Sequence, residues 1–447
     1  MAKNLNMTTG HPGRLLFSFA LPLMFGNIFQ QLYTVVDTAI VGRGVGMDAL
    51  AALGCVDWLN WMFLGIAQGF TQGFSVRMAQ KFGEKDMDGL RQTIGVSARL
   101  SIFIALAALI VAQLGLPLFL TLLQVPEDLE GMAMLYSRII LAGIPAMVFY
   151  NFCASTLRAV GDSKTPLIAM IAAAVTNVVL DCLAVFVLHW GIAGAAAATV
   201  FSQCLSGGVC AVKIARSSQL RFTKAHMKRD KALQKTLMGL GTPVALQNII
   251  ISVGGMAIQS VVNGFEKSFI AGFTATNKLY GVLEIAAISY GYAVTTYTGQ
   301  NYGAQLWERI RRGTRWAVII SIATSLIIAG VMVAFGRQIT GLFLSSELPE
   351  LELAAGNTAY LYLCFMSGAL PMLYLLYVYR SALQGMGNTL IPLLSGIVEF
   401  VVRVGGSVII GITLWQNGIF IAEVGSWIAA SILLCVAYYY QAGKMGK

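Results

Sequence analysis

Long apolar segments separated by short polar loops run through the whole chain. Each segment is long enough to cross a hydrocarbon core of about 30 Å as a helix. The pattern predicts twelve transmembrane helices, six on either side of a polar central stretch. Their expected ranges are 15–41, 51–76, 93–115, 133–156, 166–189, 192–214, 237–262, 272–297, 314–335, 357–381, 391–413 and 419–440.

Composition agrees with a chain that is mostly in contact with lipid. Of the 447 residues, 57% are hydrophobic and 11% are charged, whereas about a quarter of the residues in soluble domains are charged. The fold class expected is therefore an all-α polytopic membrane protein. The net charge of +10 is concentrated in alternate loops, which indicates membrane topology rather than nucleic-acid binding. Both termini and the basic segment Lys213–Lys235 are predicted to be cytoplasmic, this segment as a solvated linker.

The two halves of the chain repeat each other. The matched positions are Pro22 with Pro243, Asn27 with Asn248, Gly83 with Gly303, Gly161 with Gly387, and Pro166 with Pro392. The repeat predicts an amino-terminal six-helix lobe (1–214), a basic cytoplasmic linker (215–236) and a carboxyl-terminal lobe (237–447). Because six is an even number, both copies enter the membrane from the same side, as parallel repeats around a central cleft.

The first predicted helix carries a carboxylate within its apolar stretch. Asn27, Gln30, Thr34 and Asp37 recur at helical spacing, and Tyr33 lies one turn before the aspartate. An acid near the middle of a bilayer costs about 2.5 kcal/mol or more, so it is expected where a cavity, a cation or a partner offsets that cost. Asp37 is therefore a candidate for binding a cation or a proton.

A second intramembrane acid lies in the same half. Asn177 and Asp181 are spaced i, i+4 on the fifth predicted helix, and Thr199 lies on the sixth. In the second half of the chain, the positions that match Asn177 and Asp181 are Arg403 and Ser407. An all-oxygen set of Asp37, Asn177, Asp181 and Thr199 suits Na⁺ or a shared proton. The alternative for Asp181 is a packing contact with Asn177 or Thr199, worth about 0.6 kcal/mol.

The second half has unusual polar residues of its own. Glu399 and Arg403, spaced i, i+4, predict either a neutralised ion pair or a substrate contact. Glu284 is a candidate for holding a cationic substrate or a second proton, or for pairing with Lys278 or a residue distant in sequence. Glu423 is expected near a solvated helix end. Pro22 predicts a kink in the first helix, either as static architecture or as a hinge.

The sequence contains no phosphate-binding loop, no H-E-x-x-H motif and no nucleophile elbow. We therefore expect no enzyme activity, no nucleotide partner and no cofactor other than a coupling ion, Na⁺ or H⁺.

The segment Val36–Arg43, the duplicated plan and the Leu-x-x-x-Gly-x-x-x-x-Pro motif of each half resemble the multidrug and toxic compound extrusion (MATE) transporters, in particular their prokaryotic DinF-like branch. The resemblance implies that Asp37, Asn177, Asp181 and Thr199 form an amino-lobe cation site. It also implies that Pro22 bends the first helix and that Gln30 and Tyr33 line the same cavity. The carboxyl-lobe acids of the NorM-like branch have no match, since Glu266 lies at the outer end of the seventh helix.

These features together lead us to expect a monomeric antiporter in a prokaryotic cytoplasmic (inner) membrane. It would export amphipathic, often cationic, small organic molecules in exchange for Na⁺ or H⁺, with membrane lipids as its surroundings. One alternative is a flippase for a lipid or a lipid-linked saccharide, with Arg403 and Lys278 as the main cations offered to it. Another is a channel-like or sensory membrane protein without coupled transport.

Overall fold

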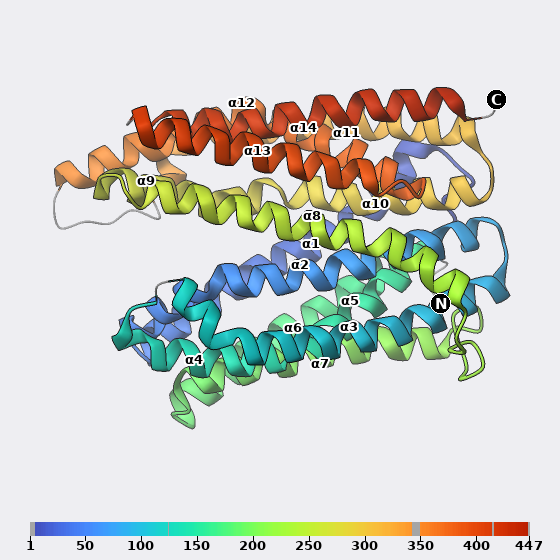
Figure 1. Cartoon of the computed structure of the whole chain (residues 1–447), viewed down its shortest axis with the longest axis horizontal. Helices are drawn as coiled ribbons and strands as arrows, with labels where there is room; N and C mark the ends of the chain where they lie inside the picture. Colours follow the sequence, from blue (N-terminus) through green and yellow to red (C-terminus); the bar gives the residue numbers. More distant parts are fainter. Residues whose placement is uncertain (1–4, 124, 342–348, 414, 446–447) are drawn as a thin grey trace. The chain divides into compact units, whose positions relative to one another are not determined.

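The structure, a computed structural model, describes residues 5–123, 125–341, 349–413 and 415–445, which form helices joined by short turns (Figure 1). The first half contains α1 (Pro12–Gly44), α2 (Met47–Gly83), α3 (Met87–Leu122), α4 (Glu127–Ala142), α5 (Ile144–Ala159), α6 (Lys164–Cys182), the π-helical turn η1 (Leu183–Val187) and α7 (Gly191–Arg216). The second half contains α8 (Lys231–Val262), α9 (Lys267–Leu283), α10 (Ile285–Gly303), α11 (Trp307–Gly341), α12 (Pro349–Gly385), α13 (Leu390–Thr413) and α14 (Gly418–Lys444). Each of the twelve predicted helices has a counterpart in these elements, which confirms the all-α fold class.

Three predicted helices are interrupted. The fourth predicted helix consists of α4 and α5, which meet at Gly143 with a bend of 42°. Pro145 lies in the first turn of α5, where a proline's missing N–H group removes no helical hydrogen bond. The fifth ends in the π-helical turn η1. The eighth consists of α9 and α10, which meet at Glu284. Hydrophobic patterning gave no sign of these interruptions, because the apolar character continues across each of them.

The outer faces of the helices have the character of a lipid-facing surface. On α3, large apolar side chains recur every four residues and are exposed: Ile102, Leu106, Ile110 and Leu114 have 54%, 48%, 57% and 79% of their surface accessible. Among the described residues, nine helices are long and apolar enough to cross a membrane, and α4 with α5 makes a tenth. The protein is therefore a polytopic membrane protein.

Backbone conformation repeats between the halves even where side chains differ. Lys85 and Gln305 both have left-handed backbones, with φ of 61° and 58°, and Gly161 and Gly387 have φ of 87° and 86°. A left-handed conformation is costly for a residue with a side chain, so its recurrence at matched positions is a property of the repeated fold. The internal duplication predicted from the sequence is thus visible in the turns.

The chain divides into two compact units. Unit 1 contains Met1–Met7 and Leu21–Asn248, and unit 2 contains Thr8–Ala20 and Ile249–Lys447. Two of the three boundaries lie inside long helices, α1 and α8, and the third lies just before α1. The division into lobes at residues 214 and 237 remains a prediction from the sequence repeat.

The central basic segment is folded, so the prediction of a solvated linker is wrong for part of it. Between α7 and α8, Leu220 is 2% exposed within a hydrophobic cluster of unit 1. Hydrogen bonds also hold the segment to α3: Arg91 Nη2 donates to Ser218 O (2.9 Å), Arg99 Nη1 to Met227 O (3.2 Å) and Gln92 Nε2 to Asp230 Oδ2 (3.1 Å). The composition of the segment did not predict these contacts, because they depend on one buried leucine and mainly on hydrogen bonds accepted by backbone carbonyl groups.

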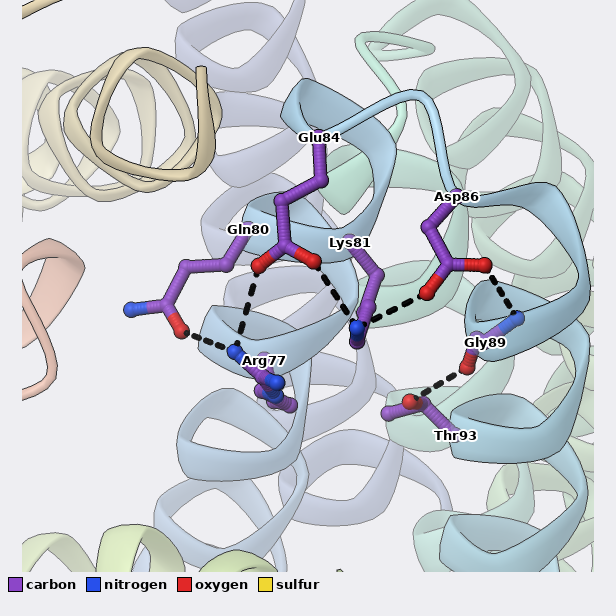
Figure 2. A network of polar contacts seen from close by, with 7 residues as sticks. All are labelled: Arg77, Gln80, Lys81, Glu84, Asp86, Gly89 and Thr93. Carbon is purple, nitrogen blue, oxygen red and sulfur yellow. Dashed lines mark hydrogen bonds and ion pairs between the residues drawn. The ribbon is translucent and has the colours of Figure 1, made fainter. Parts of the chain in front are cut away.

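Charged side chains fasten the turn between α2 and α3 (Figure 2). Lys81 Nζ contacts both Glu84 and Asp86 at 2.8 Å, and Asp86 also accepts a hydrogen bond from Gly89 N at 2.9 Å, which caps the first turn of α3. The Lys81 ammonium and the Gly89 amide together lower the pKa of the Asp86 carboxyl below its usual value. Leu306 holds the matching position in the second half, so only the first copy has a side-chain cap here.

Replacing Asp86 with alanine should reduce the stability of the protein at neutral pH by about 1 kcal/mol, since a helix cap is lost. Because the pKa of Asp86 is lowered in the folded protein, its ionised carboxylate contributes fully to stability at pH values above the usual aspartate pKa of about 3.9. This contribution is lost as the pH falls through the lowered pKa. Thermal unfolding of the two proteins should therefore differ at pH 7 and converge in stronger acid. Asp88→Ala is the control, because Asp88 is exposed and its ion pair is with Arg91 on the same helix. An equal loss of stability in that variant would contradict the capping role of Asp86.

Candidate functional site

The end of α6 carries two buried polar side chains on one face. Asp181 is 0% exposed and Asn177, one turn earlier, is 1% exposed. Asn177 Nδ2 donates a hydrogen bond of 3.4 Å to Thr199 Oγ1 on α7. Helical spacing on α6 and the packing of α7 beside it therefore bring together three of the four residues expected to form the cation site.

Asp37 of α1 is the fourth residue expected at the site, and its carboxyl group lies within electrostatic range of that of Asp181. Four buried oxygens nevertheless receive no hydrogen bond from a described residue: Asp37 Oδ1, Asn177 Oδ1, Asp181 Oδ1 and Asp181 Oδ2. Buried acceptors without donors cost free energy. The arrangement has a surplus of oxygen lone pairs that a proton or a hard cation would satisfy.

The number of strong ligands limits which cation would fit. Within the part of the chain that is described, no group of three or more His, Cys, Asp or Glu side chains is placed to hold a metal ion. Two carboxylates with neutral amide and hydroxyl oxygens suit a monovalent cation or a proton better than a transition metal, which favours nitrogen and sulfur ligands.

Two aromatic hydroxyl groups lie in the surroundings of this acid pair. Tyr33 is close enough to interact electrostatically with Asp37 and Asp181; that Gln30 and Tyr33 line one cavity with these acids remains a prediction. Tyr136 of α4 lies within electrostatic range of the same two acids and of Asp57 on α2. Sequence reasoning missed Tyr136 and Asp57, although Asp57 is an acid inside the apolar stretch 51–76 and could have been noticed.

A change of helix type follows Asp181 immediately. In η1, the amide of Leu188 donates to Leu183 O at 2.9 Å, an i to i−5 hydrogen bond. Such π-helical turns are rare and occur often at functional sites. Asp181 therefore lies in the last α-helical turn before an irregular backbone segment, and no sequence pattern predicted this.

Pro22 lies inside the continuous helix α1, so its role as a hinge remains a prediction.

In unit 2, the predicted pair between Glu399 and Arg403 is wrong. Arg403 Nη2 instead contacts Glu423 Oε1 of α14 at 2.7 Å, and Arg380 of α12 pairs with Glu399. The i, i+4 spacing permits a contact along α13, but oppositely charged groups on the neighbouring helices are the ones in contact. Arg380 and Glu423 are both 8% exposed, so the expectation that Glu423 lies at a solvated helix end is wrong.

Glu284 has a hydroxyl partner rather than a cation. Tyr377 Oη donates a hydrogen bond of 3.3 Å to Glu284 Oε2, and Tyr280 lies within electrostatic range of the carboxylate. Lys278 is exposed on α9, and the contacts described for Glu284 include no ion pair with it. The carboxylate therefore occupies the interior of unit 2 without a salt bridge among the described residues.

Comparison with known proteins gives consistent matches along the chain. A family model described as MatE matches residues 22–183 and 243–409. The "Probable multidrug resistance protein YpnP" of Bacillus subtilis (strain 168) is 30% identical over 450 residues, covering 99% of this chain and 98% of its own. The "Probable multidrug resistance protein YoeA" of the same organism is 29% identical over 343 residues, covering 74% of this chain and 73% of its own.

The fold matches solved structures over its full length. A structure described as the outward-facing conformation of a multidrug resistance MATE family transporter of the MOP superfamily has a TM-score of 0.92 at 23% identity. The match covers 100% of this chain and 99% of that one. At this level of identity, the likeness establishes a shared fold.

Proposed function

Since the chain belongs to the multidrug and toxic compound extrusion (MATE) family of membrane transporters, which are not enzymes, we propose that it is a cation-coupled exporter of organic compounds. Its relatives named as multidrug resistance proteins support multidrug efflux as the general activity. Export would run outward across a prokaryotic cytoplasmic membrane, driven by inward movement of Na⁺ or H⁺.

The observation that carries this proposal is the pair of acids in unit 1, of which Asp181 is buried and Asp37 is partly exposed. The two lie within electrostatic range of each other, and three of their four oxygens accept no hydrogen bond from a described residue. Two carboxylates held this closely repel each other when both are ionised, and a proton or a monovalent cation removes that repulsion. Binding and release of the coupling ion at this site therefore change the relative free energies of conformations in which the distance between the two acids differs.

Such a site couples two flows if each ligand prefers a different conformation. Cation binding at Asp37, Asn177, Asp181 and Thr199 would stabilise one state, and the organic substrate would stabilise another. Differential affinity, rather than affinity alone, determines how far either ligand shifts the population. The protein acting as a monomer is sufficient for this scheme.

The flippase alternative has less support once the cations are located. Of the two cations it relied on, Arg403 is buried and paired with Glu423. Lys278 alone is exposed. A headgroup phosphate would therefore meet one of these cations rather than two.

Ethidium export from proteoliposomes tests the proposed function. An imposed Na⁺ gradient or a pH gradient, applied separately, should drive ethidium transport by the wild-type protein, and the effective gradient identifies the coupling ion. Asp37→Asn should reduce this transport at least a hundredfold, because the substituted amide cannot bind or release a proton or balance a cation. Asp128→Asn, in an exposed turn of α4, should transport normally; transport by neither gradient in a folded wild-type protein would refute the antiporter proposal.

A further inference from the structure

Glu284 lies in a break between two helices, near the middle of the stretch 272–297 that the sequence predicts to cross the membrane. α9 has 17 residues and α10 has 19 residues, so about 25 Å of helix precedes the glutamate and a similar length follows it. An ionisable group at such a depth is expensive, and intramembrane acids of this kind are usually functional. A role is therefore expected for this carboxylate.

Glu284 lies among aromatic hydroxyl groups from two helices. Tyr377 of α12 donates a hydrogen bond to its Oε2 at 3.3 Å, and Tyr280 of α9 lies within electrostatic range of the carboxylate. The ring of Tyr280 is stacked on Trp427 of α14, with centroids 5.6 Å apart and planes at 14°. Glu284, Tyr280 and Tyr377 all retain partial surface access, so the carboxylate is positioned without being sealed off.

The charges around Glu284 do not balance. Arg403 and Glu423 lie within electrostatic range of it, but they neutralise each other at 2.7 Å, and Arg380 is paired with Glu399. These five groups carry two positive and three negative charges when ionised, so one negative charge is left over. Since each arginine already has its own carboxylate, the excess charge belongs to Glu284.

We propose that Glu284, flanked by Tyr280 and Tyr377, binds the positively charged centre of the organic compound that the protein exports. A single carboxylate with two hydroxyl groups offers too few ligands for a metal ion. Aromatic rings beside a carboxylate favour a large, weakly hydrated organic cation. This inference rests on the proposed export function and assigns substrate recognition to unit 2, separate from the acid pair of unit 1.

Equilibrium binding of ethidium to the purified protein, followed by fluorescence polarisation in detergent, tests this assignment. Glu284→Gln keeps the size of the side chain and should raise the dissociation constant at least tenfold, because the charge that attracts the cation is lost. Glu284→Asp keeps the charge and should retain most of the affinity. Glu308→Gln, which removes an exposed acid from the same unit, should bind as tightly as the wild-type protein.

The outcomes separate this inference from the proposed function. If the wild-type protein exports ethidium and Glu284→Gln binds it within twofold of the wild-type affinity, the assignment of Glu284 is wrong while the export function stands. If the wild-type protein neither binds nor exports ethidium or another organic cation, both proposals fail. Thermal unfolding of each variant establishes that weak binding is not a consequence of misfolding.

Discussion

Replacing Asp181 with asparagine should abolish gradient-driven export while leaving thermal stability unchanged or raised. Asp181 is 0% exposed, and neither of its carboxyl oxygens receives a hydrogen bond from a described residue. A buried carboxylate facing Asp37 without donors lowers stability, and the neutral amide removes the repulsion between the two acids. The same change removes the group that would exchange the coupling ion.

This opposite effect on stability and transport distinguishes a coupling residue from a packing residue. If Asp181 served only as a polar contact for Asn177 or Thr199, its replacement would lower stability or have no effect, and export would continue. The measurements are the thermal midpoint in detergent and ethidium export from proteoliposomes under the gradient that drives the wild-type protein. A loss of at least a hundredfold in export, with no fall in the midpoint, is the expected result.

Asp162 is the matched control, because it is a buried acid of the same unit whose oxygens are satisfied. Its carboxylate accepts hydrogen bonds from Thr165 N at 2.9 Å and Thr165 Oγ1 at 2.7 Å. Asp162→Ala should therefore lower stability by about 1–2 kcal/mol and reduce export by less than tenfold. Equal export in Asp181→Asn and the wild-type protein would remove Asp181 from the coupling site.

Replacing Arg403 with methionine should destabilise the protein by about 3–5 kcal/mol, the largest stability effect expected here. Arg403 is 5% exposed and contacts Glu423 at 2.7 Å, with a further hydrogen bond of 3.3 Å to Ser426 Oγ. Methionine fills a similar volume, so the cost arises mainly because Glu423 is left as a buried, uncompensated charge.

A double variant tests this cause. Adding Glu423→Leu to Arg403→Met removes both charges, and most of the lost stability should return, because buried ion pairs replaced by apolar residues are often neutral in effect. Breaking the Arg311–Glu308 pair through Glu308→Gln should cost less than about 1 kcal/mol, since Glu308 is 70% exposed. If the double variant is less stable than Arg403→Met alone, the ion pair has a role beyond charge compensation.

The two halves illustrate where sequence reasoning succeeded. Apolar length predicted every helical span, because a membrane helix must be apolar along its lipid-facing surface and cannot be much shorter than the bilayer core. The repeat was also readable, since matched glycines and polar turns mark the same backbone conformations. Asn177 and Asp181 were placed on one face of α6 because helical spacing is a local property, whereas the contact of Asn177 with Thr199 depends on the packing of α7 against α6.

Contacts between helices were the part that sequence reasoning missed. Glu399 and Arg403 have an ideal spacing for a pair, yet each is paired with a residue about twenty positions away, Arg380 or Glu423. The folded central segment and the break at Glu284 were missed for a similar reason, since both depend on packing between elements.

The sequence by itself thus determined the membrane class, the helical spans, the internal duplication and a candidate pair of coupling acids. Only the tertiary structure decided which charges neutralise each other, which buried oxygens remain without a donor, and which carboxylate lies among tyrosines. The physical reason is that helix formation and lipid exposure depend on residues a few positions apart. The partner of a buried polar group, in contrast, depends on which helices pack together, and those helices are distant along the chain.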